Sequence, residues 1–314
     1  MTTAGGGRPV LALFGATALG KSDVADALAE RLDAEVVVAD SMQVYRGLPL
    51  VTNQAQTGRG ARRHLVGFVE PQREFTVAEY AQRAHEVIDG LRAEARAVIV
   101  EGGSGLYLRA ALGDLSFAER ADPEIRRELE ERWEREPAAL VEELRRLDPG
   151  TLARLDAANP RRVIRALEAV LVRGGPLPPE QAAQLWRPPE RYPNRLVALV
   201  PDDDREALRL RIERRVVEML ARGALEEVAR ARAAGPLSRT VRQAIGVREL
   251  CAVLEGELTA DEAAARMKAR TRALARRQLT WMRKLPRAAL VPADGRPPGA
   301  VAADVLSLLE TPAW

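Results

Sequence analysis

The sequence predicts an α/β protein, a doubly wound parallel sheet covered by helices and interrupted by an all-helical insertion. Three observations predict this class. A glycine-rich loop joins an apolar strand at 10–14 to an amphipathic helix at 22–32. β-branched runs then alternate with helical patterns as far as residue 115. Residues 116–194 carry helical patterns without strands, so we expect a core at 9–115 and 195–314 and an insertion at 116–194.

The glycine-rich loop, GATALGKS at 15–22, fits the phosphate-binding pattern G-x-x-x-x-G-K-[ST]. Glycines let the backbone wrap an anion, and the N–H groups at the helix start point toward it. Lys21 adds a cation, and Ser22 adds a hydroxyl for Mg²⁺. Lysine occurs only at 21, 268 and 284 among 48 basic residues, so its use in the loop is selective. The loop predicts a bound diphosphate, and either a nucleotide or the diphosphate of another alcohol would fit.

The remaining elements follow the same alternation. Strands are predicted at 34–39, 64–69, 97–101, 195–200 and 289–291, and core helices at 75–92, 202–221, 226–234, 239–254, within 266–287 and at 300–309. In the insertion, helices are predicted at 123–135, 137–147, 149–156 and 160–172, followed by a proline-rich connector at 176–194. Asp40 follows the strand at 34–39, so it should lie at the same sheet edge as the phosphate loop.

Composition excludes several classes. Hydrophobic content of 46% with 30% charged residues is ordinary for a soluble globular chain. No apolar run is long enough for a membrane span, and the N-terminus lacks the apolar core of a signal peptide. One cysteine, Cys251, excludes a disulfide framework and a thiolate zinc site, and two histidines cannot build a metal cluster. We expect a cytoplasmic monomer without a membrane partner.

The basic residues are unevenly placed. The net charge is only +3, so no uniform polyanion-binding surface follows. Residues 266–287, however, hold nine lysines and arginines and no acid. This segment predicts contact with a phosphate backbone, and the alternative is a solvated helix face.

A second informative stretch is DSMQVYRG at 40–47. A carboxylate beside a bound diphosphate can serve the metal or take a proton from an acceptor substrate. A simpler interpretation is an aspartate that caps the next turn. A small-molecule or nucleotide kinase with a helical lid fits the same loop. An RNA-binding ATPase normally needs an acidic pair at a strand end, and Glu101 is a lone candidate.

Six stretches together resemble the tRNA dimethylallyltransferases: GATALGKS, DSMQVYRG, EGGSGLYLRA, NPRRVIRALE, QAIGVREL and RRQLTWMR, in this order between Val10 and Leu285. The resemblance implies a P-loop kinase-like fold whose helical insertion grips the anticodon stem-loop of tRNA. It also implies transfer of a dimethylallyl group from dimethylallyl diphosphate to N6 of adenosine 37, in tRNAs that read codons beginning with U. Mg²⁺ is the implied cofactor.

The resemblance also implies site residues. Those for the diphosphate are Gly15, Thr17, Ala18, Leu19, Gly20, Lys21, Ser22 and Arg215, with Ser22 on Mg²⁺. Asp40, Lys21 and Arg215 are the implied catalytic residues, with Asp40 as general base. The implied tRNA contacts are Asp40, Ser41, Met42, Gln43, Ser104, Arg126, Pro160, Arg161, Arg162, Arg242, Gln243, Gly246, Arg276, Arg277, Gln278, Thr280, Trp281 and Arg283. The chain departs from the family pattern at 48–55, where Val51 replaces a glycine and Gln54 a lysine.

The implied chemistry suits these residue types. Charge develops on a leaving diphosphate, and loop amides, a lysine, an arginine and Mg²⁺ would stabilise it. The adenine amine is a poor nucleophile, so a carboxylate that accepts its proton is useful. The base must also leave its stack, and Tyr45, Tyr107 and Trp281 are candidates for the walls that receive it. The alternative for each aromatic is an ordinary core position.

Overall fold

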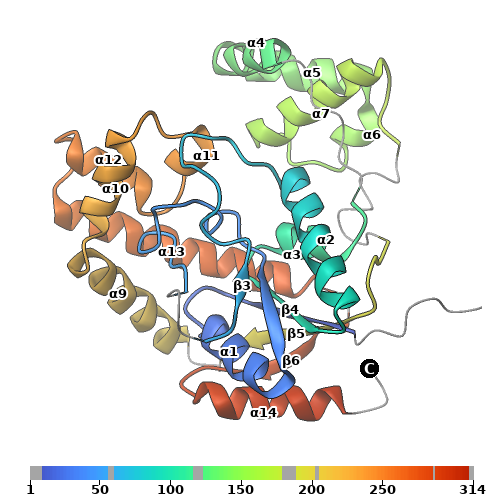
Figure 1. Ribbon diagram of the computed structural model, residues 1–314. Coiled ribbons are helices and arrows are strands. Elements are labelled where there is room, and N and C mark those ends of the chain that lie inside the picture. The colour runs from blue at the N-terminus through green and yellow to red at the C-terminus, as the bar shows by residue number, and fades with distance from the viewer. Residues whose placement is uncertain are drawn as a thin grey trace, which may run out of the picture. The chain divides into compact units, whose positions relative to one another are not determined.

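The computed structural model describes residues 9–55, 60–115, 123–178, 189–201, 205–285 and 287–310. The chain divides into two compact units (Figure 1). One comprises Met1–Gly113 and Glu190–Trp314, and the other comprises Asp114–Pro189. These bounds lie close to the boundaries expected at 116 and 194, and each unit is described by itself.

The first unit is built on six parallel strands in the order β3-β2-β4-β1-β5-β6. The strands are β1 (Val10–Gly15), β2 (Ala34–Val38), β3 (Arg63–His64), β4 (Ala97–Gly102), β5 (Asn194–Val200) and β6 (Ala289–Pro292). All residues of β1 and β2 are buried, as expected for apolar strands covered on both faces. The predicted parallel α/β sheet is confirmed.

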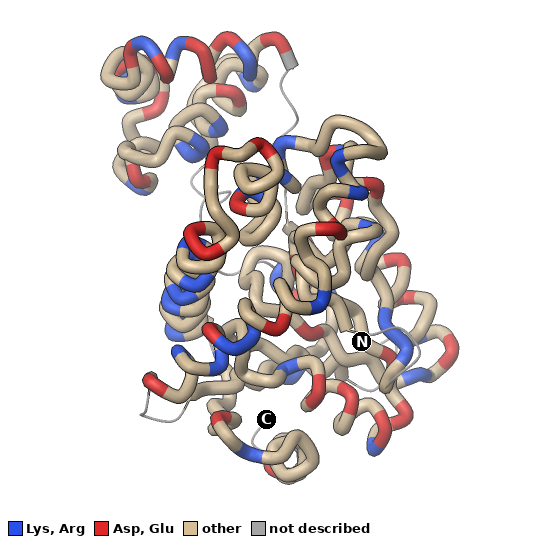
Figure 2. Tube along the Cα trace, turned by 90° about the vertical axis from the view of Figure 1, so that its left-hand side faces the viewer, with Lys and Arg blue, Asp and Glu red and all other residues tan. Residues whose placement is uncertain are grey.

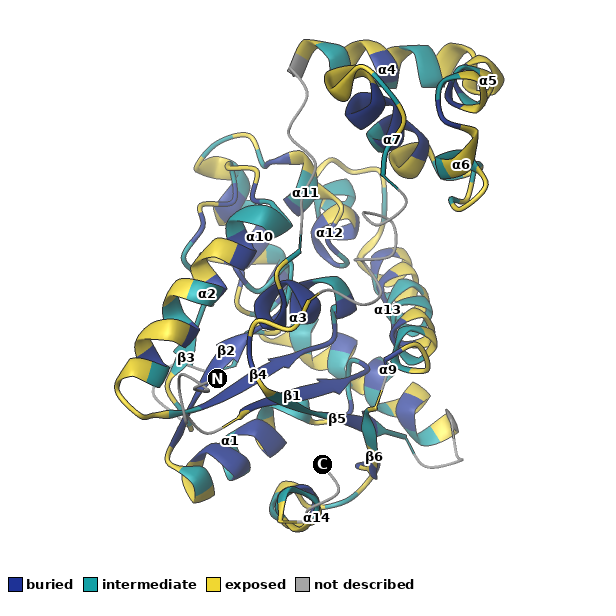
Figure 3. Ribbon diagram, turned by 90° about the vertical axis from the view of Figure 1, so that its right-hand side faces the viewer, coloured by how far each residue is buried: buried dark blue, intermediate teal, exposed yellow. Residues whose placement is uncertain are grey.

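Helices cover both faces of this sheet (Figure 3). α1 (Lys21–Leu32) and α14 (Pro298–Leu309) pack on one face, where Leu28 and Val305 join the core beneath β1 and β2. On the other face lie α2 (Val77–Ala93), α3 (Gly105–Leu112) and α13 (Ala260–Met282). α9 (Arg205–Ala221) packs against α13, and α10 (Ala224–Ala233), α11 (Arg239–Arg242) and α12 (Val247–Leu254) follow it in the chain.

Several predicted elements differ from the structure. The strand expected at 64–69 is only Arg63–His64, because Leu65 and Gly67 take positive φ angles of 63° and 58°. The helix expected at 239–254 breaks into α11 and α12, because Gly246 has a φ of 96° that no helix accommodates. Sequence patterns missed α3 after the glycine-rich turn. Residues 202–204 of the helix expected at 202–221 and residues 179–188 of the expected connector lie outside the described residues.

The second unit is entirely helical in its described part. Its helices are α4 (Pro123–Arg135), α5 (Pro137–Leu147), α6 (Pro149–Leu152) and α7 (Pro160–Arg173), so the helix expected at 149–156 is shorter. Leu129, Leu140, Leu144 and Leu167 form its apolar core. Across both units, no described helix is long and apolar enough to cross a membrane.

Candidate active site

The phosphate loop at 15–22 connects the end of β1 to the first turn of α1. Ala18 and Gly20 have φ angles of 67° and 73°, which curl the backbone back on itself. The first N–H groups of a helix have no acceptor within the helix, so those of α1 face the hollow of the loop. The local geometry is therefore that of an anion site.

An apolar cluster seats the loop against two distant helices. Ala16 and Leu19 are buried against Leu208 and Ile212 of α9 and against Ala275 of α13. Leu19 therefore packs in an apolar cluster. This packing places α9 and α13 at the edge of the phosphate loop.

The polar side chains of these helices then contact the loop directly. Arg215 donates a hydrogen bond to Thr17 Oγ1 at 3.0 Å, and Arg211 Nε donates to the carbonyl oxygen of Ala18 at 3.0 Å. Gln278 Oε1 accepts from the Thr17 N–H at 2.8 Å, so this predicted tRNA residue lies against the phosphate loop. Burial lowers the pKa of Arg215 to about 10, which still leaves its guanidinium charged near neutral pH.

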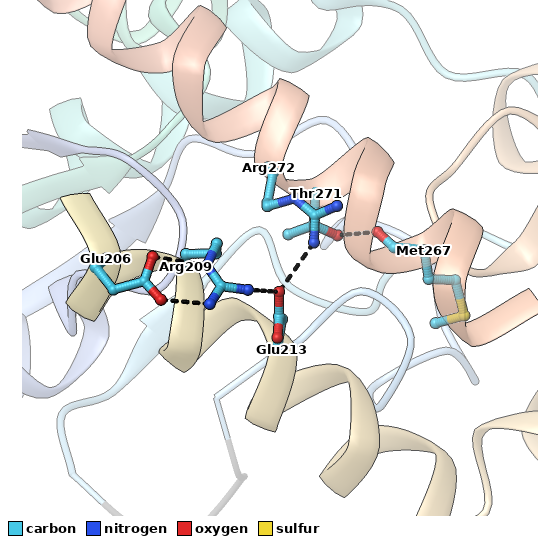
Figure 4. Close-up of polar contacts among 6 residues, drawn as sticks. All are labelled: Glu206, Arg209, Glu213, Met267, Thr271 and Arg272. Atoms are coloured by element: carbon cyan, nitrogen blue, oxygen red, sulfur yellow. Dashed lines mark hydrogen bonds and ion pairs between the residues drawn. The ribbon is translucent and has the colours of Figure 1, made fainter. Parts of the chain in front are cut away.

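An ion pair joins α9 to α13 beside the loop, next to two ion pairs within α9 (Figure 4). Glu213 of α9 accepts from Arg272 of α13 at 3.1 Å and from Arg209 at 2.7 Å, and Arg209 also pairs with Glu206. The Arg272–Glu213 pair thus links the two helices that carry Arg215 and Gln278.

A pocket of about 770 Å³ opens at the phosphate loop. The predicted residues that line it are Thr17, Ala18, Gly20, Lys21, Ser22, Asp40, Met42, Gln43, Arg215 and Gln278. Gly15 and Leu19 are buried in the loop's support and do not line the pocket, and Ser41 and Ser104 do not line it either. Residues from the ends of β1, β2 and β4 thus meet at one edge of the sheet, as the parallel topology predicts.

Asp40 has the turn-capping role considered from the sequence, and it also lies in the pocket, where its metal or proton-acceptor role stays a prediction. Its Oδ1 accepts hydrogen bonds from the N–H groups of Met42 at 2.8 Å and Gln43 at 3.3 Å, so it caps the turn after β2. It also lines the pocket, where its charge acts on Lys21 and Arg215. The aspartate is therefore oriented by its own turn and lies beside the cationic groups of the loop.

Lys21 and Glu101 form the buried charged centre of the pocket. Lys21 Nζ donates to the carbonyl oxygen of Ala16 at 3.1 Å. Burial lowers the pKa of Lys21 to about 8, against the opposing effect of Glu101 and Asp40. Burial likewise raises the pKa of Glu101, although Arg63 and Lys21 oppose that shift.

The loop at 48–55 departs from the family pattern but still forms one wall of the pocket, through residues 51–55. The two oxygens of the buried Glu227 carboxylate accept hydrogen bonds from the loop, from the backbone N–H groups of Leu50 and Val51, each at 2.8 Å. Val51 packs so closely on Gly246 that a Cβ there would lie 2.3 Å from it. The loop is thus anchored without the glycine and lysine of the family pattern.

Three glycines after β4 permit close contacts with three different neighbours. A Cβ on Gly102 would lie 2.1 Å from the carbonyl oxygen of Ala39, and one on Gly103 would lie 2.3 Å from Gln278 Nε2. A Cβ on Gly105 would lie 2.1 Å from the Trp281 ring. The motif EGGSGLY therefore lets β2 and α13 approach β4 and α3.

The other residues predicted to contact tRNA lie in three places. Arg276, Arg277, Thr280 and Arg283 are exposed on or just beyond the basic part of α13 (Figure 2), and Arg242 and Gln243 are exposed at the end of α11. Gly246 is buried. Arg126, Pro160, Arg161 and Arg162 are exposed in the helical unit, the last three in the first turn of α7. Their roles stay predictions.

The aromatic residues do not form walls of the described pocket. Tyr45 and Tyr107 are buried core residues, and Tyr107 packs on Tyr80 with 4.6 Å between ring centroids. Trp281 is half-buried, with Arg109 5.1 Å from its ring centroid. For the two tyrosines the ordinary core interpretation is correct, because both are inaccessible to a base in this pocket.

Sequence patterns missed Arg63, Arg211 and Asp294. Arg63 and Asp294 lie outside the six sequence stretches that carry the family resemblance. Arg211 is one of several arginines on α9, and the sequence alone does not single it out. A signal for Asp294 is its place after a parallel strand, β6, on the same sheet edge as the loop. Asp294 is buried and forms an ion pair with Arg211, which in turn holds Ala18.

We expect Asp294→Asn to lower the free energy of unfolding by roughly 1–3 kcal/mol, because it leaves Arg211 without its counter-charge. Urea unfolding measures this. The matched control is Asp304→Asn, which removes an exposed partner of Arg296 and should cost no more than about 1 kcal/mol. Equal losses in the two variants would contradict a supporting role for the Arg211–Asp294 pair.

A parallel sheet with this loop and an arginine-lined pocket defines a P-loop α/β enzyme. A sequence model of the family described as IPP transferase matches residues 43–285. The chain is 38% identical over 293 residues to the tRNA dimethylallyltransferase of Moorella thermoacetica, covering 90% of each chain. It is 40% identical over 284 residues to that of Paenarthrobacter aurescens, covering 89% of each. The chain belongs to the tRNA dimethylallyltransferase family, and it is a prenyltransferase.

Solved structures agree with this assignment. A full-length tRNA isopentenylpyrophosphate transferase from Bacillus halodurans superposes with a TM-score of 0.70 at 30% identity, covering 96% of this chain and 95% of that one. A eukaryotic dimethylallyltransferase acting on tRNA shares the fold, with a TM-score of 0.75 at 24% identity, covering 91% of this chain and 74% of that one.

Proposed function

We propose that this enzyme transfers the dimethylallyl group of dimethylallyl diphosphate to N6 of adenosine 37, in tRNAs that read codons beginning with U. The observation that carries the proposal is the meeting of an anion site and a carboxylate in one pocket. The loop amides, Lys21 and Arg215 provide the anion site, and Asp40 provides the carboxylate. The name of the family's enzymes gives tRNA and the dimethylallyl group, and the sequence resemblance implies the diphosphate donor and adenosine 37.

In this proposal the N6 amine attacks C1 of the allyl group as the bond from C1 to the diphosphate oxygen breaks. Negative charge grows on the leaving diphosphate, where Lys21, Arg215 and the amides of the loop stabilise it. The amine nitrogen becomes acidic as its bond to carbon forms, and Asp40 accepts its proton. The hydrogen bonds from Met42 and Gln43 to Oδ1 orient the carboxylate for that transfer.

The residues at the pocket fit a magnesium ion. Ser22, Asp40 and Glu101 offer hard oxygen donors, which this ion prefers. The described residues contain no cluster of three or more histidine, cysteine or acidic side chains suited to a metal. Ser22 would therefore hold the ion together with the diphosphate itself, as is usual for Mg²⁺ in phosphate sites. When bound, Mg²⁺ neutralises charge on the diphosphate.

The proposed RNA partner is the anticodon stem-loop. Exposed arginines on α13 and on the first turn of α7 would contact its phosphates, which set position rather than sequence. The adenosine would leave its stack to reach the pocket. Action as a monomer in the cytoplasm belongs to the same proposal.

The test is a label-transfer assay. The enzyme is incubated with Mg²⁺, dimethylallyl diphosphate labelled in the alkyl group, and unmodified tRNA, and in parallel with ATP alone. We expect label in the tRNA and none in a tRNA with guanosine at position 37. ATP turnover without label transfer would instead support a kinase with a helical lid, and would overturn the proposal.

We expect Arg276→Ala combined with Arg277→Ala to weaken tRNA binding and to flatten its salt dependence. Each lost phosphate contact should reduce the slope of log affinity against log salt by roughly 0.7–0.9. Filter binding at several salt concentrations measures this. The control combines Arg31→Ala with Arg92→Ala, at the far ends of α1 and α2. An unchanged slope in the α13 variant would make that face plain solvated surface.

A further inference from the structure

We propose that Glu101 and Arg63 form a clamp that orients the Ser22 hydroxyl toward Mg²⁺, with Glu101 as the positioning residue. The inference rests on the proposed function, because the ion serves the diphosphate. It concerns residues outside the phosphate loop: Glu101 is the penultimate residue of β4, and Arg63 lies on the edge strand β3.

Glu101 is placed by the sheet next to the phosphate loop. Its neighbours across the ladder are Leu13 of β1 and Val38 of β2, so it stands between the loop and Asp40. Its side chain is 4% exposed, and Oε1 accepts from the Ser22 hydroxyl at 3.2 Å. Within the described chain, Oε2 is buried and has no hydrogen-bond partner, although the residue lines the pocket. A buried carboxylate oxygen without a donor is unfavourable, so Oε2 is open to a hydrogen-bond donor that enters the pocket.

The contact with Glu101 sets the direction of the Ser22 hydroxyl, and that direction determines whether the oxygen can bind a metal ion. A serine hydroxyl has one hydrogen and two lone pairs. In the structure the hydrogen points to Glu101, so the lone pairs face away from the carboxylate. A metal ion needs a lone pair, and a wrongly rotated hydroxyl would present its hydrogen instead. Outer partners of this kind orient the direct ligands of metal sites.

Arg63 fixes the carboxylate in turn. Its side chain is 8% exposed, and NH1 donates to Glu101 Oε1 at 2.8 Å. NH2 donates to Asp26 Oδ1 at 2.7 Å and to the carbonyl oxygen of Ser22 at 2.9 Å. The planar guanidinium therefore joins β4 to two turns of α1, which a lysine could not do at the same time.

The alternative is a buried ion pair that only stabilises the fold. The two roles differ in whether the Glu101 side chain affects metal affinity through Ser22 or affects only the stability of the fold. A clamp acts through Ser22, so its loss and the loss of the Ser22 hydroxyl should not add. A stabilising pair would change the free energy of unfolding and leave metal affinity as it was.

The experiment measures Mn²⁺ binding by electron paramagnetic resonance, with the full-length enzyme and inorganic diphosphate. We expect Glu101→Leu, which removes both carboxylate oxygens at a similar side-chain volume, to weaken Mn²⁺ affinity by about 10–100-fold. Arg63→Lys, a second variant in case the first does not fold, should weaken it in the same direction. The control Glu168→Gln changes a buried carboxylate of the helical unit, which pairs with Arg165 and Arg126, and should bind Mn²⁺ like wild type.

A double-mutant cycle decides between the roles. We expect Glu101→Leu with Ser22→Ala to bind Mn²⁺ no more weakly than Ser22→Ala alone, because each change removes the hydrogen bond between these two side chains. Additive losses, or wild-type Mn²⁺ affinity in folded Glu101→Leu, would overturn the clamp. A wild-type enzyme that transfers no label to tRNA would instead overturn the proposed function, so the two failures are distinct.

Discussion

Replacing Asp40 with asparagine is expected to slow prenyl transfer by about 10²–10⁴-fold, the usual contribution of a positioned general base. Asparagine keeps the side-chain oxygen that accepts from Met42 and Gln43, so the turn after β2 survives. Its amide cannot take the proton of the adenine amine. Single-turnover label transfer at saturating tRNA measures the rate, and filter binding measures tRNA affinity, which should stay close to wild type.

The comparison with Asp40→Ala separates the two roles of the carboxylate. Alanine removes both the base and the turn cap, so any loss beyond that of asparagine belongs to the turn. A rate in Asp40→Asn equal to wild type would reduce Asp40 to a cap. A large loss of tRNA affinity in that variant would make it a docking residue.

Replacing Lys21 with methionine is expected to cost about 10²–10³-fold in transfer and yet to stabilise the fold. The rate falls because a donor to the leaving diphosphate is lost. The fold gains because burial disfavours the ammonium, as its lowered pKa of about 8 indicates. Removing that charge should raise the free energy of unfolding by about 1–3 kcal/mol near neutral pH. Urea unfolding of both proteins tests this.

The pH dependence gives a second check on Lys21. Its pKa is about 8 in the folded chain, against the ordinary value of 10.5 for a free lysine side chain. Between these values the unfolded chain binds more protons, so this group makes wild-type stability rise with pH across that window. Lys21→Met should lose that rise. Diphosphate affinity of the wild type should fall above pH 8, and a flat profile would contradict the assignment.

The parts of the site that are local in the chain were predictable. The strand, glycine loop and helix at 10–32 follow from apolar pattern and turn chemistry alone, and Asp40 follows from its place after a parallel strand. Arg63, Arg211 and Asp294 were not, because their roles depend on contacts between segments far apart in the sequence. The contact of Gln278 with Thr17 spans 261 residues.

The errors in secondary structure have a common cause. Leu65 and Gly246 both take positive φ angles. Leu65 follows the end of β3, and Gly246 lies between α11 and α12, where the apolar pattern predicts one continuous element. The spacing of apolar residues predicts which face of an element is buried. It does not predict a positive φ angle, least of all at a leucine, which rarely adopts one. Tyr107 failed differently: a buried aromatic and a pocket wall have the same sequence signature.

The missing side chains after β4 have a consequence for how the reaction centre tolerates change. Gly102 meets the backbone of β2 just before the proposed base, and Gly103 and Gly105 meet two residues of α13. A methyl group at Gly102 or Gly105 would overlap the backbone of Ala39 or the Trp281 ring, so the segment before the proton acceptor or the helix that supports the anion loop would have to shift. Group transfer depends on ångström-scale alignment of its reactants. The glycines thus set the distance between neighbouring elements, and we expect substitutions at these positions to be tolerated poorly.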